Sequence, residues 1–239
     1  MTDTSHDTPD PITVAARFNG PPGSANGGYV SGRVARFVDA PAVRVRLRTP
    51  PPLETPMEVR RTPGGGVHLL SGEELVAEGA PAPVPQRHTA PVPPAEAERA
   101  QEGYRGLRDH PFPTCFVCGT AREAGDGLRL FAGPVGGDPA ATTVACVWRP
   151  GPDTTDTPME WAALDCPGGW SVDITGRPML LGQLTAAVFA PVRAGRAHVV
   201  VGRLLDVQGR KVRTASALYD GDGAELARAE AVWIRLREG

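Results

Sequence analysis

A proline-rich segment in the first half of the chain constrains the fold more than any other feature of the sequence. Six prolines lie between residues 79 and 94, at positions 81, 83, 85, 91, 93 and 94. Because proline lacks a backbone N–H and fixes φ, neither a helix interior nor a central strand can pass through such a segment. We therefore predict a semi-rigid surface connector here, prolonged by a short helix over 95–108, that joins two structured segments.

The two segments show the same order of predicted elements. In the first, we predict a helix over 26–38 and then strands over 42–48, 57–59, 67–70 and 75–78. In the second, we predict a helix over 158–175 and then strands over 180–189, 197–205, 212–219 and 225–236. A helix followed by an antiparallel meander, present twice, predicts an α+β duplication. Two unrelated α+β halves remain the alternative.

Charge and cysteine content narrow the class of protein. The formal net charge is −2, which argues against broad electrostatic binding to nucleic acid or to an anionic membrane surface. No stretch approaches the roughly 18 apolar residues of a membrane-spanning helix. Four cysteines in a chain of 239 residues do not form a disulfide framework. The polar start, residues 1–10, lacks the features of a secretory signal, so we expect a cytoplasmic protein with no nucleic-acid or membrane partner.

Several motifs resemble a known family. They are the glycine-rich Phe18–Tyr29, a strand interrupted over Arg48–Leu53, the helical Trp161–Asp165, and Phe189–Gly195. The chain resembles the double-hotdog acyl-CoA thioesterase-like family, which has two hotdog repeats in one chain. The resemblance implies an α+β double hotdog, in which two helix-plus-antiparallel-sheet repeats share one sheet.

The resemblance also implies a division of the chain and an activity. The expected parts are a flexible N-terminus over 1–14, a first hotdog repeat over 15–85, a proline-rich linker with a short helix and a CxxC knuckle over 86–127, and a second repeat over 128–239. The implied activity is hydrolysis of an acyl-CoA or acyl-carrier-protein thioester without a cofactor. The alternative is a non-catalytic protein that binds acyl thioesters or lipids. A monomer with an internal pseudo-dimer, or a homodimer, is expected.

Asp165 is the strongest candidate for a catalytic residue. It lies four positions after Trp161 and therefore shares an apolar helical face with it, shortly before Pro167. A carboxylate on such a face is unfavourable unless it is used or paired. An alternative role is capping of the segment that begins at Pro167. The family resemblance implies that Asp165 activates water or attacks the thioester carbonyl.

The same resemblance implies helper residues on two strands. The nearest matches are Gln183 or Thr185 on the strand after the helix, and Glu230 on the last strand. The family often has glutamine on the last strand, so Glu230 departs from its pattern. The sequence also lacks the serine-hydrolase motif G-x-S-x-G, a phosphate-binding loop and a histidine near Asp165.

The glycine-rich start of the first helix is the expected substrate-binding element. Asn26, Gly27 and Gly28 would offer backbone N–H groups to the thioester oxygen, because helix starts carry unpaired donors and a positive dipole end. The first helix has no acid two turns onward, and the second has Asp165 but no glycine at its start. We therefore predict one complete site, Gly27 or Gly28 with Asp165, and a vacant pseudo-site that pairs Pro158 with Ala35.

The motif Cys115-x-x-Cys118-Gly119 has the spacing of half a tetrahedral zinc site. A second pair of ligands is missing nearby; His110 stands five residues upstream, and Cys146 or Cys166 would have to fold back to complete a site. We favour two cysteines that pack a turn, with no metal, and keep zinc binding by Cys115 and Cys118 as the alternative.

Overall fold

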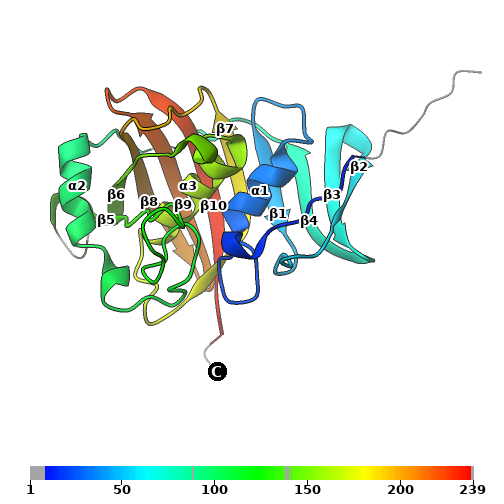
Figure 1. The fold of residues 1–239 in the computed structure, drawn as a ribbon, viewed down its shortest axis with the longest axis horizontal. Helices are drawn as coiled ribbons and strands as arrows, with labels where there is room; N and C mark the ends of the chain where they lie inside the picture. The colour runs from blue at the N-terminus through cyan, green and yellow to red at the C-terminus, as the bar shows by residue number, and fades with distance from the viewer. Residues whose placement is uncertain (1–8, 88, 138–139, 141, 238–239) are drawn as a thin grey trace, which may run out of the picture.

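A computed structural model describes residues 9–87, 89–137, 140 and 142–237, and within them one ten-stranded antiparallel sheet spans the molecule (Figure 1). The strand order is β2-β3-β4-β1-β7-β10-β9-β8-β6-β5. Strands β1–β4 come from the first segment of the chain and strands β5–β10 from the second. The predicted sharing of one sheet is therefore confirmed.

The first segment forms one helix and four strands. They are α1 (Gly27–Ala35), β1 (Val43–Leu47), β2 (Glu58–Thr62), β3 (Gly66–Ser71) and β4 (Glu74–Pro81). In β1, the valines Val43 and Val45 are buried and the arginines Arg44 and Arg46 are exposed. This alternation is the period-2 pattern of a strand with one face on the core, as the sequence predicts.

The second segment begins with strands rather than with its helix. Its elements are β5 (Gly133–Pro134), β6 (Thr143–Trp148), α3 (Thr157–Gly169), β7 (Met179–Val188), β8 (His198–Gln208), β9 (Lys211–Asp220) and β10 (Glu225–Arg235). Strand β6 pairs with β8, with Cys146 opposite Val200. The sequence prediction omitted β6 because five of its six residues are buried, so both faces are covered and no alternation marks it.

The two repeats meet at β1 and β7, which pair antiparallel with Val45 opposite Leu184. Helices α1 and α3 lie side by side on one face of the sheet (Figure 1). Between them and the sheet lies one large core, to which Val45, Leu164 and Leu184 contribute fully buried side chains. The pairing of β1 with β7 places the start of α1 beside the second repeat.

The proline-rich connector and the helix α2 (Pro94–Glu102) lie on the opposite face of the sheet. Ala97 of α2 packs against Val147 and Val201 in a second, smaller cluster. The Tyr219 hydroxyl donates to the Thr89 carbonyl, and the Arg87 N–H donates to Glu230 Oε1 at 3.1 Å. Helix α2 ends six residues before the predicted end because Gly103 caps it, and a short 3-10 turn, Arg105–Leu107, follows.

The start of the described chain is packed rather than loose. Ile12 forms a β-bridge with Met57, and Ile12 and Val14 are buried in the core. Residues 12–14, which the sequence prediction placed in a flexible N-terminus, therefore add to the edge of the first repeat; positions 1–8 of that prediction lie outside the described residues. Among the described residues, no helix combines the length and the apolar character needed to span a membrane.

Candidate active site

The site begins at the N-terminus of α1. Asn26 is the N-cap residue, and its Oδ1 accepts a hydrogen bond of 2.9 Å from the Tyr29 N–H. Asparagine is favoured at this position because its side chain satisfies a backbone donor that has no partner within the helix. Capping uses only the carbonyl oxygen of the side chain, so the Nδ2 group remains available for a second contact across the site.

That second contact is Asp165 of α3. Its side chain is buried, with 2% of the residue exposed. Its Oδ2 accepts two hydrogen bonds of 3.0 Å, from Asn26 Nδ2 and from the Gly28 N–H. Its Oδ1 is also buried but has no hydrogen-bond partner among the described residues. One carboxylate oxygen is therefore held by the opposite repeat, and the other makes no hydrogen bond within the described residues.

Two glycines allow α1 and α3 to approach so closely. A Cβ atom at Gly28 would lie 2.4 Å from Asp165 Cβ, and one at Gly32 would lie 2.6 Å from Pro158 Cα. Gly28 and Gly32 are four residues apart and therefore face the same side of α1. The sequence prediction treats Gly28 only as a donor; the i, i+4 spacing of the glycines is the signal that indicates the helix contact.

The surroundings of Asp165 favour the protonated, neutral form of its carboxyl group more strongly than bulk water does. Burial raises the pKa of Asp165 to about 7, although the hydrogen bonds from the Gly28 N–H and the Asn26 side chain oppose the shift. Desolvation is the larger effect because the whole side chain is withdrawn from water. A carboxyl group of this kind exchanges a proton near neutral pH.

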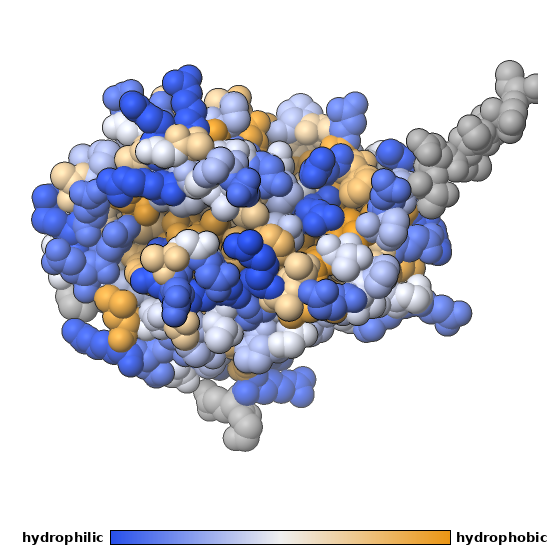
Figure 2. Space-filling view, viewed as in Figure 1, coloured by the Kyte–Doolittle hydropathy of each residue, from blue (hydrophilic) through white to orange (hydrophobic). Residues whose placement is uncertain are grey.

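A pocket of about 330 Å³ opens beside Asp165. Its wall includes Asn26, Gly27 and Asp165 together with the apolar residues Leu181 and Trp233. The N–H of Gly27, the first residue of α1, has no acceptor among the described residues. Figure 2 shows hydrophobic side chains in patches on the molecular face that carries α1 and α3, with hydrophilic residues around them. An apolar pocket with a few convergent polar groups is typical of a small-molecule site.

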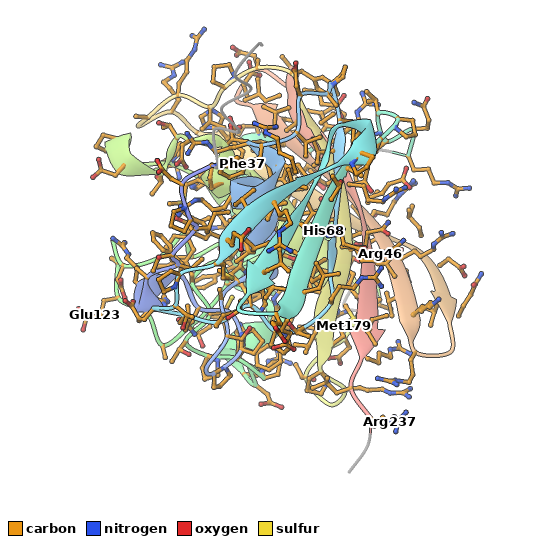
Figure 3. The ribbon with its side chains drawn as sticks, turned by 90° about the vertical axis from the view of Figure 1, so that its right-hand side faces the viewer. Phe37, Arg46, His68, Glu123, Met179 and Arg237 are labelled. Atoms are coloured by element: carbon orange, nitrogen blue, oxygen red, sulfur yellow. The ribbon has the colours of Figure 1, made fainter. Side chains whose placement is uncertain are left out.

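The three predicted helpers lie on the other face of the sheet. Thr185 stands between Glu230 and Arg44 in the strand register, and Gln183 accepts a hydrogen bond from the exposed Arg46. In Figure 3, Arg46 lies on the side of the sheet away from the helices, whereas Phe37 lies on the helix side. The structure thus brings Asp165 together with Asn26, Gly27 and Gly28, and it does not bring it together with Gln183, Thr185 or Glu230.

A β-bulge in β7 explains why Gln183 and Thr185 face away from the helices. Trp233 faces Leu181 and Val232 faces Gln183, so Gly182 is an extra residue in β7. A bulge reverses which residues face the core. Leu181 lines the pocket, so regular alternation from it would point Gln183 and Thr185 toward the helices. Instead, Leu184 and Ala186 are buried on that side. An isolated glycine within a strand, here Gly182, is the signal that could have indicated the bulge.

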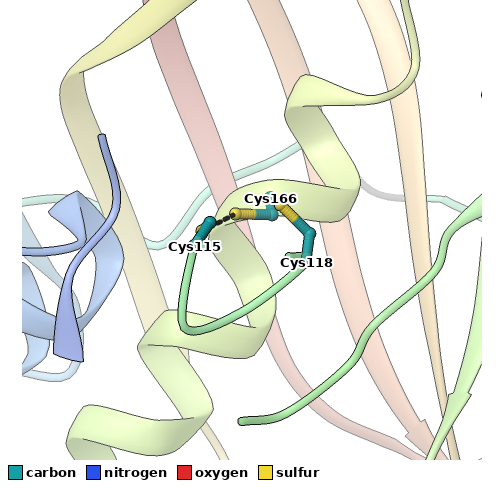
Figure 4. Close-up of side chains that lie close together, drawn as sticks. All are labelled: Cys115, Cys118 and Cys166. Carbon is teal, nitrogen blue, oxygen red and sulfur yellow. Dashed lines mark hydrogen bonds between the residues drawn. The ribbon is translucent and has the colours of Figure 1, made fainter. Parts of the chain in front are cut away.

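Three cysteines lie next to Asp165. The sulfur atoms of Cys115, Cys118 and Cys166 lie within 4.8 Å of one another, and the Cys115 and Cys166 Sγ atoms are 3.8 Å apart (Figure 4). Hydrogen bonds with the Cys118 and Cys166 thiols lower the pKa of Cys115, although burial opposes the shift. The sequence prediction pairs Cys115 with Cys118, but no sequence pattern selects Cys166.

His110 is near the cysteines but is engaged elsewhere. Its Nδ1 accepts from the Phe112 N–H at 2.9 Å, and its Nε2 lies 3.0 Å from the Cys118 carbonyl oxygen. Both ring nitrogens therefore hold the backbone of the CxxC turn. His110 fixes the shape of this turn and offers no nitrogen to a metal or substrate in this arrangement.

Comparisons with solved structures identify the fold. A putative thioesterase from Novosphingobium aromaticivorans is 15% identical and matches with a TM-score of 0.61 over 95% of this chain and 95% of that chain. A hotdog-fold protein of unknown function from Alicyclobacillus acidocaldarius matches with a TM-score of 0.60, at 12% identity, over 96% and 93% of the two chains. An acyl-CoA thioesterase II from Mycobacterium marinum matches with a TM-score of 0.59, at 14% identity, over 95% and 92%.

The chain has the double-hotdog fold. Each of these matches covers nearly the whole of both chains, so both repeats and the sheet that they share belong to the common architecture. The fold expected from the sequence resemblance is confirmed. No protein-family model and no curated protein sequence matches the chain.

Proposed function

We propose that this protein hydrolyses acyl thioesters, with an acyl-CoA or an acyl carrier protein as the thiol partner. The observation that carries the proposal is the buried Asp165 carboxylate, which is held through Oδ2 by the start of α1 and borders an apolar pocket with Oδ1 unpartnered among the described residues. A buried acid that is positioned by one oxygen and free at the other is suited to proton transfer. The apolar wall of the pocket suits an acyl chain.

The proposed reaction uses water as the nucleophile. Asp165 Oδ1 accepts a proton from a water molecule as the water oxygen bonds to the thioester carbonyl carbon. The free N–H of Gly27, at the positive end of the α1 dipole, donates to the oxygen that becomes negative. Collapse of the tetrahedral intermediate breaks the C–S bond, and the departing thiolate takes up the proton to give a free thiol and a carboxylic acid.

Names of structural neighbours support the class of substrate. The Mycobacterium marinum protein is described as an acyl-CoA thioesterase II and the Novosphingobium protein as a putative thioesterase. A fold hosts many activities, so the proposal depends on the site rather than on these names. The family resemblance left open a second role for the acid, direct attack on the carbonyl carbon, which would form a mixed anhydride on Asp165.

Release of free thiol from a panel of acyl-CoA substrates tests the proposal. Asp165→Asn should lower turnover at least about a hundredfold, in the range for loss of a general base, while acyl-CoA binding is retained. Asp153→Asn, which changes an exposed aspartate outside the pocket, is the matched control and should keep full turnover. Binding of acyl-CoA without hydrolysis by the wild-type protein would instead identify a non-catalytic binding protein.

A single turnover in ¹⁸O-water separates the two roles of the acid. Water activation places the label only in the released acid. Direct attack, followed by attack of water on the aspartyl carbonyl carbon of the anhydride, places the label in the Asp165 carboxylate. Mass spectrometry of the peptide that contains this residue would detect it, and label there identifies direct attack.

A further inference from the structure

The sulfur atoms of the three cysteines beside the pocket lie within 4.8 Å of one another, the arrangement of a candidate metal site. Cys115 and Cys118 come from one turn of the linker, and Cys166 comes from α3, 51 positions after Cys115. All three are buried, and all three line the pocket that contains Asp165. Buried cysteines usually pack as small apolar side chains, but here three sulfur atoms from two separate elements point at one another (Figure 4).

The spacing of the sulfurs matches a tetrahedral metal site. Zinc–sulfur bonds of about 2.3 Å at tetrahedral angles place two ligand sulfurs about 3.8 Å apart. The Cys115 and Cys166 Sγ atoms are separated by 3.8 Å, and the remaining separations are no more than 4.8 Å. Small rotations of the thiols would therefore bring all three sulfurs to bonding distance of one ion.

The backbone around the CxxC turn holds this geometry in place. The Gly119 N–H donates to the Cys115 carbonyl at 2.8 Å, and a Cβ at Gly119 would lie 2.5 Å from the carbonyl oxygens of Cys115 and Pro113. Only glycine fits this position. The Tyr104 hydroxyl donates to the Cys118 carbonyl oxygen at 3.0 Å, and His110 Nε2 contacts the same oxygen. The turn is therefore fixed before any ligand binds.

A polar donor also faces the sulfurs. Asn26 Nδ2 lies 3.9 Å from the Sγ atoms of both Cys115 and Cys166 while it donates to Asp165 Oδ2. Hydrogen bonds to ligand sulfurs orient and stabilise metal-bound thiolates. The same side chain thus joins the thiol group to the proposed catalytic carboxylate.

We propose that Cys115, Cys118 and Cys166 bind one thiophilic divalent metal ion, with Zn²⁺ the best match, and that the fourth coordination position faces the pocket. Thiolates are soft ligands that select zinc over magnesium or calcium. Three protein ligands with one open position are the arrangement of zinc sites that also bind a small molecule. Cys146, the fourth cysteine, lies on β6 and is not one of the three sulfurs.

Cobalt titration of the reduced, chelator-free full chain tests the site without any substrate. Co²⁺ bound to three thiolates gives a near-ultraviolet charge-transfer band, which should saturate at one equivalent per chain and be displaced by Zn²⁺. Cys166→Ser and Cys118→Ser should each weaken binding at least about a hundredfold, because losses of second-shell partners alone cost about 10–100-fold. Cys146→Ser should bind as the wild type does. The result is independent of acyl-thioester turnover.

A measurement on the wild-type protein tests the metal site even if the cysteine variants do not fold. X-ray absorption at the zinc edge should show three sulfur ligands at about 2.3 Å and one lighter ligand. A shell of nitrogen and oxygen only, an affinity of folded Cys166→Ser for Co²⁺ equal to that of the wild type, or no band with Co²⁺ in excess would each overturn the proposal.

Discussion

Gly28 and Asp165, 137 positions apart in the chain, are joined by a hydrogen bond of 3.0 Å from the Gly28 N–H to Oδ2 of Asp165. This bond connects the helix of the first repeat to the helix of the second. It turns a backbone donor of α1 toward the acid, so Gly28 positions the carboxylate, whereas the neighbouring Gly27 N–H has no acceptor among the described residues. The site is consequently composite, because neither repeat contains both groups.

Substitution of Asn26 separates its two roles. Asn26→Ser keeps an N-cap side chain but removes the amide that donates to Asp165. We expect turnover to fall at least about tenfold, since a hydrogen bond to a charged group contributes about 1.5–3 kcal/mol. Asn26→Ala should lose the same activity and, in addition, about 1 kcal/mol of stability as the cap is lost. Equal thermal stability of the two variants would contradict the capping role.

Gly32→Ala tests the close contact of the helices. The added methyl group meets the Pro158 backbone at 2.6 Å, and such overpacking costs about 1–3 kcal/mol. Higher helix propensity offsets about 1 kcal/mol of this, so we expect a net loss of stability in chemical unfolding together with reduced turnover. The control is Gly151→Ala, at φ −75° with its nearest neighbour at 3.9 Å. It should unfold like the wild type.

Gln183→Ala and Thr185→Ala test the orientation of β7. Both side chains lie on the face of the sheet opposite α3. We expect the rate of thiol release to stay within about twofold of the wild type, whereas a helper that acts on the substrate would contribute about 100-fold or more. A large decrease in kcat with unchanged stability would show that these residues reach the reacting atoms.

Glu160→Gln should make stability less dependent on pH. Burial raises the pKa of Glu160, although the Val192 N–H donates to its Oε1 at 3.1 Å and opposes the shift. The folded state therefore favours the protonated acid, and stability falls as pH rises from the usual glutamate pKa through the raised value. The substituted amide would keep the same acceptor without a charge. In thermal unfolding, the variant should have a higher Tm than the wild type at pH 7–8, and this difference in Tm should disappear near pH 4.

Local chemistry of the chain was sufficient to predict the division into two repeats. Prolines exclude regular structure wherever they cluster, and the alternation of valine and arginine in 43–46 marks a half-buried strand without any tertiary information. Asn26 before two glycines indicates a helix start. This helix start, together with the family resemblance, predicts that Gly27 or Gly28 pairs with Asp165. The structure brings Gly28 and Asp165 into contact.

Only the tertiary structure decided which side chains share the site. The Gly182 bulge turns Gln183 and Thr185 away from the helices, and the cover provided by α2 conceals the period of β6. Cys166 meets Cys115 and Cys118 because α3 packs against the linker turn, a contact between segments distant in sequence. Periodicity and capping depend on neighbours along the chain, so the sequence determines them directly. The direction of a side chain after a bulge depends on how whole elements pack, and so does the contact between thiols that are distant in sequence. No local sequence pattern predicts this packing.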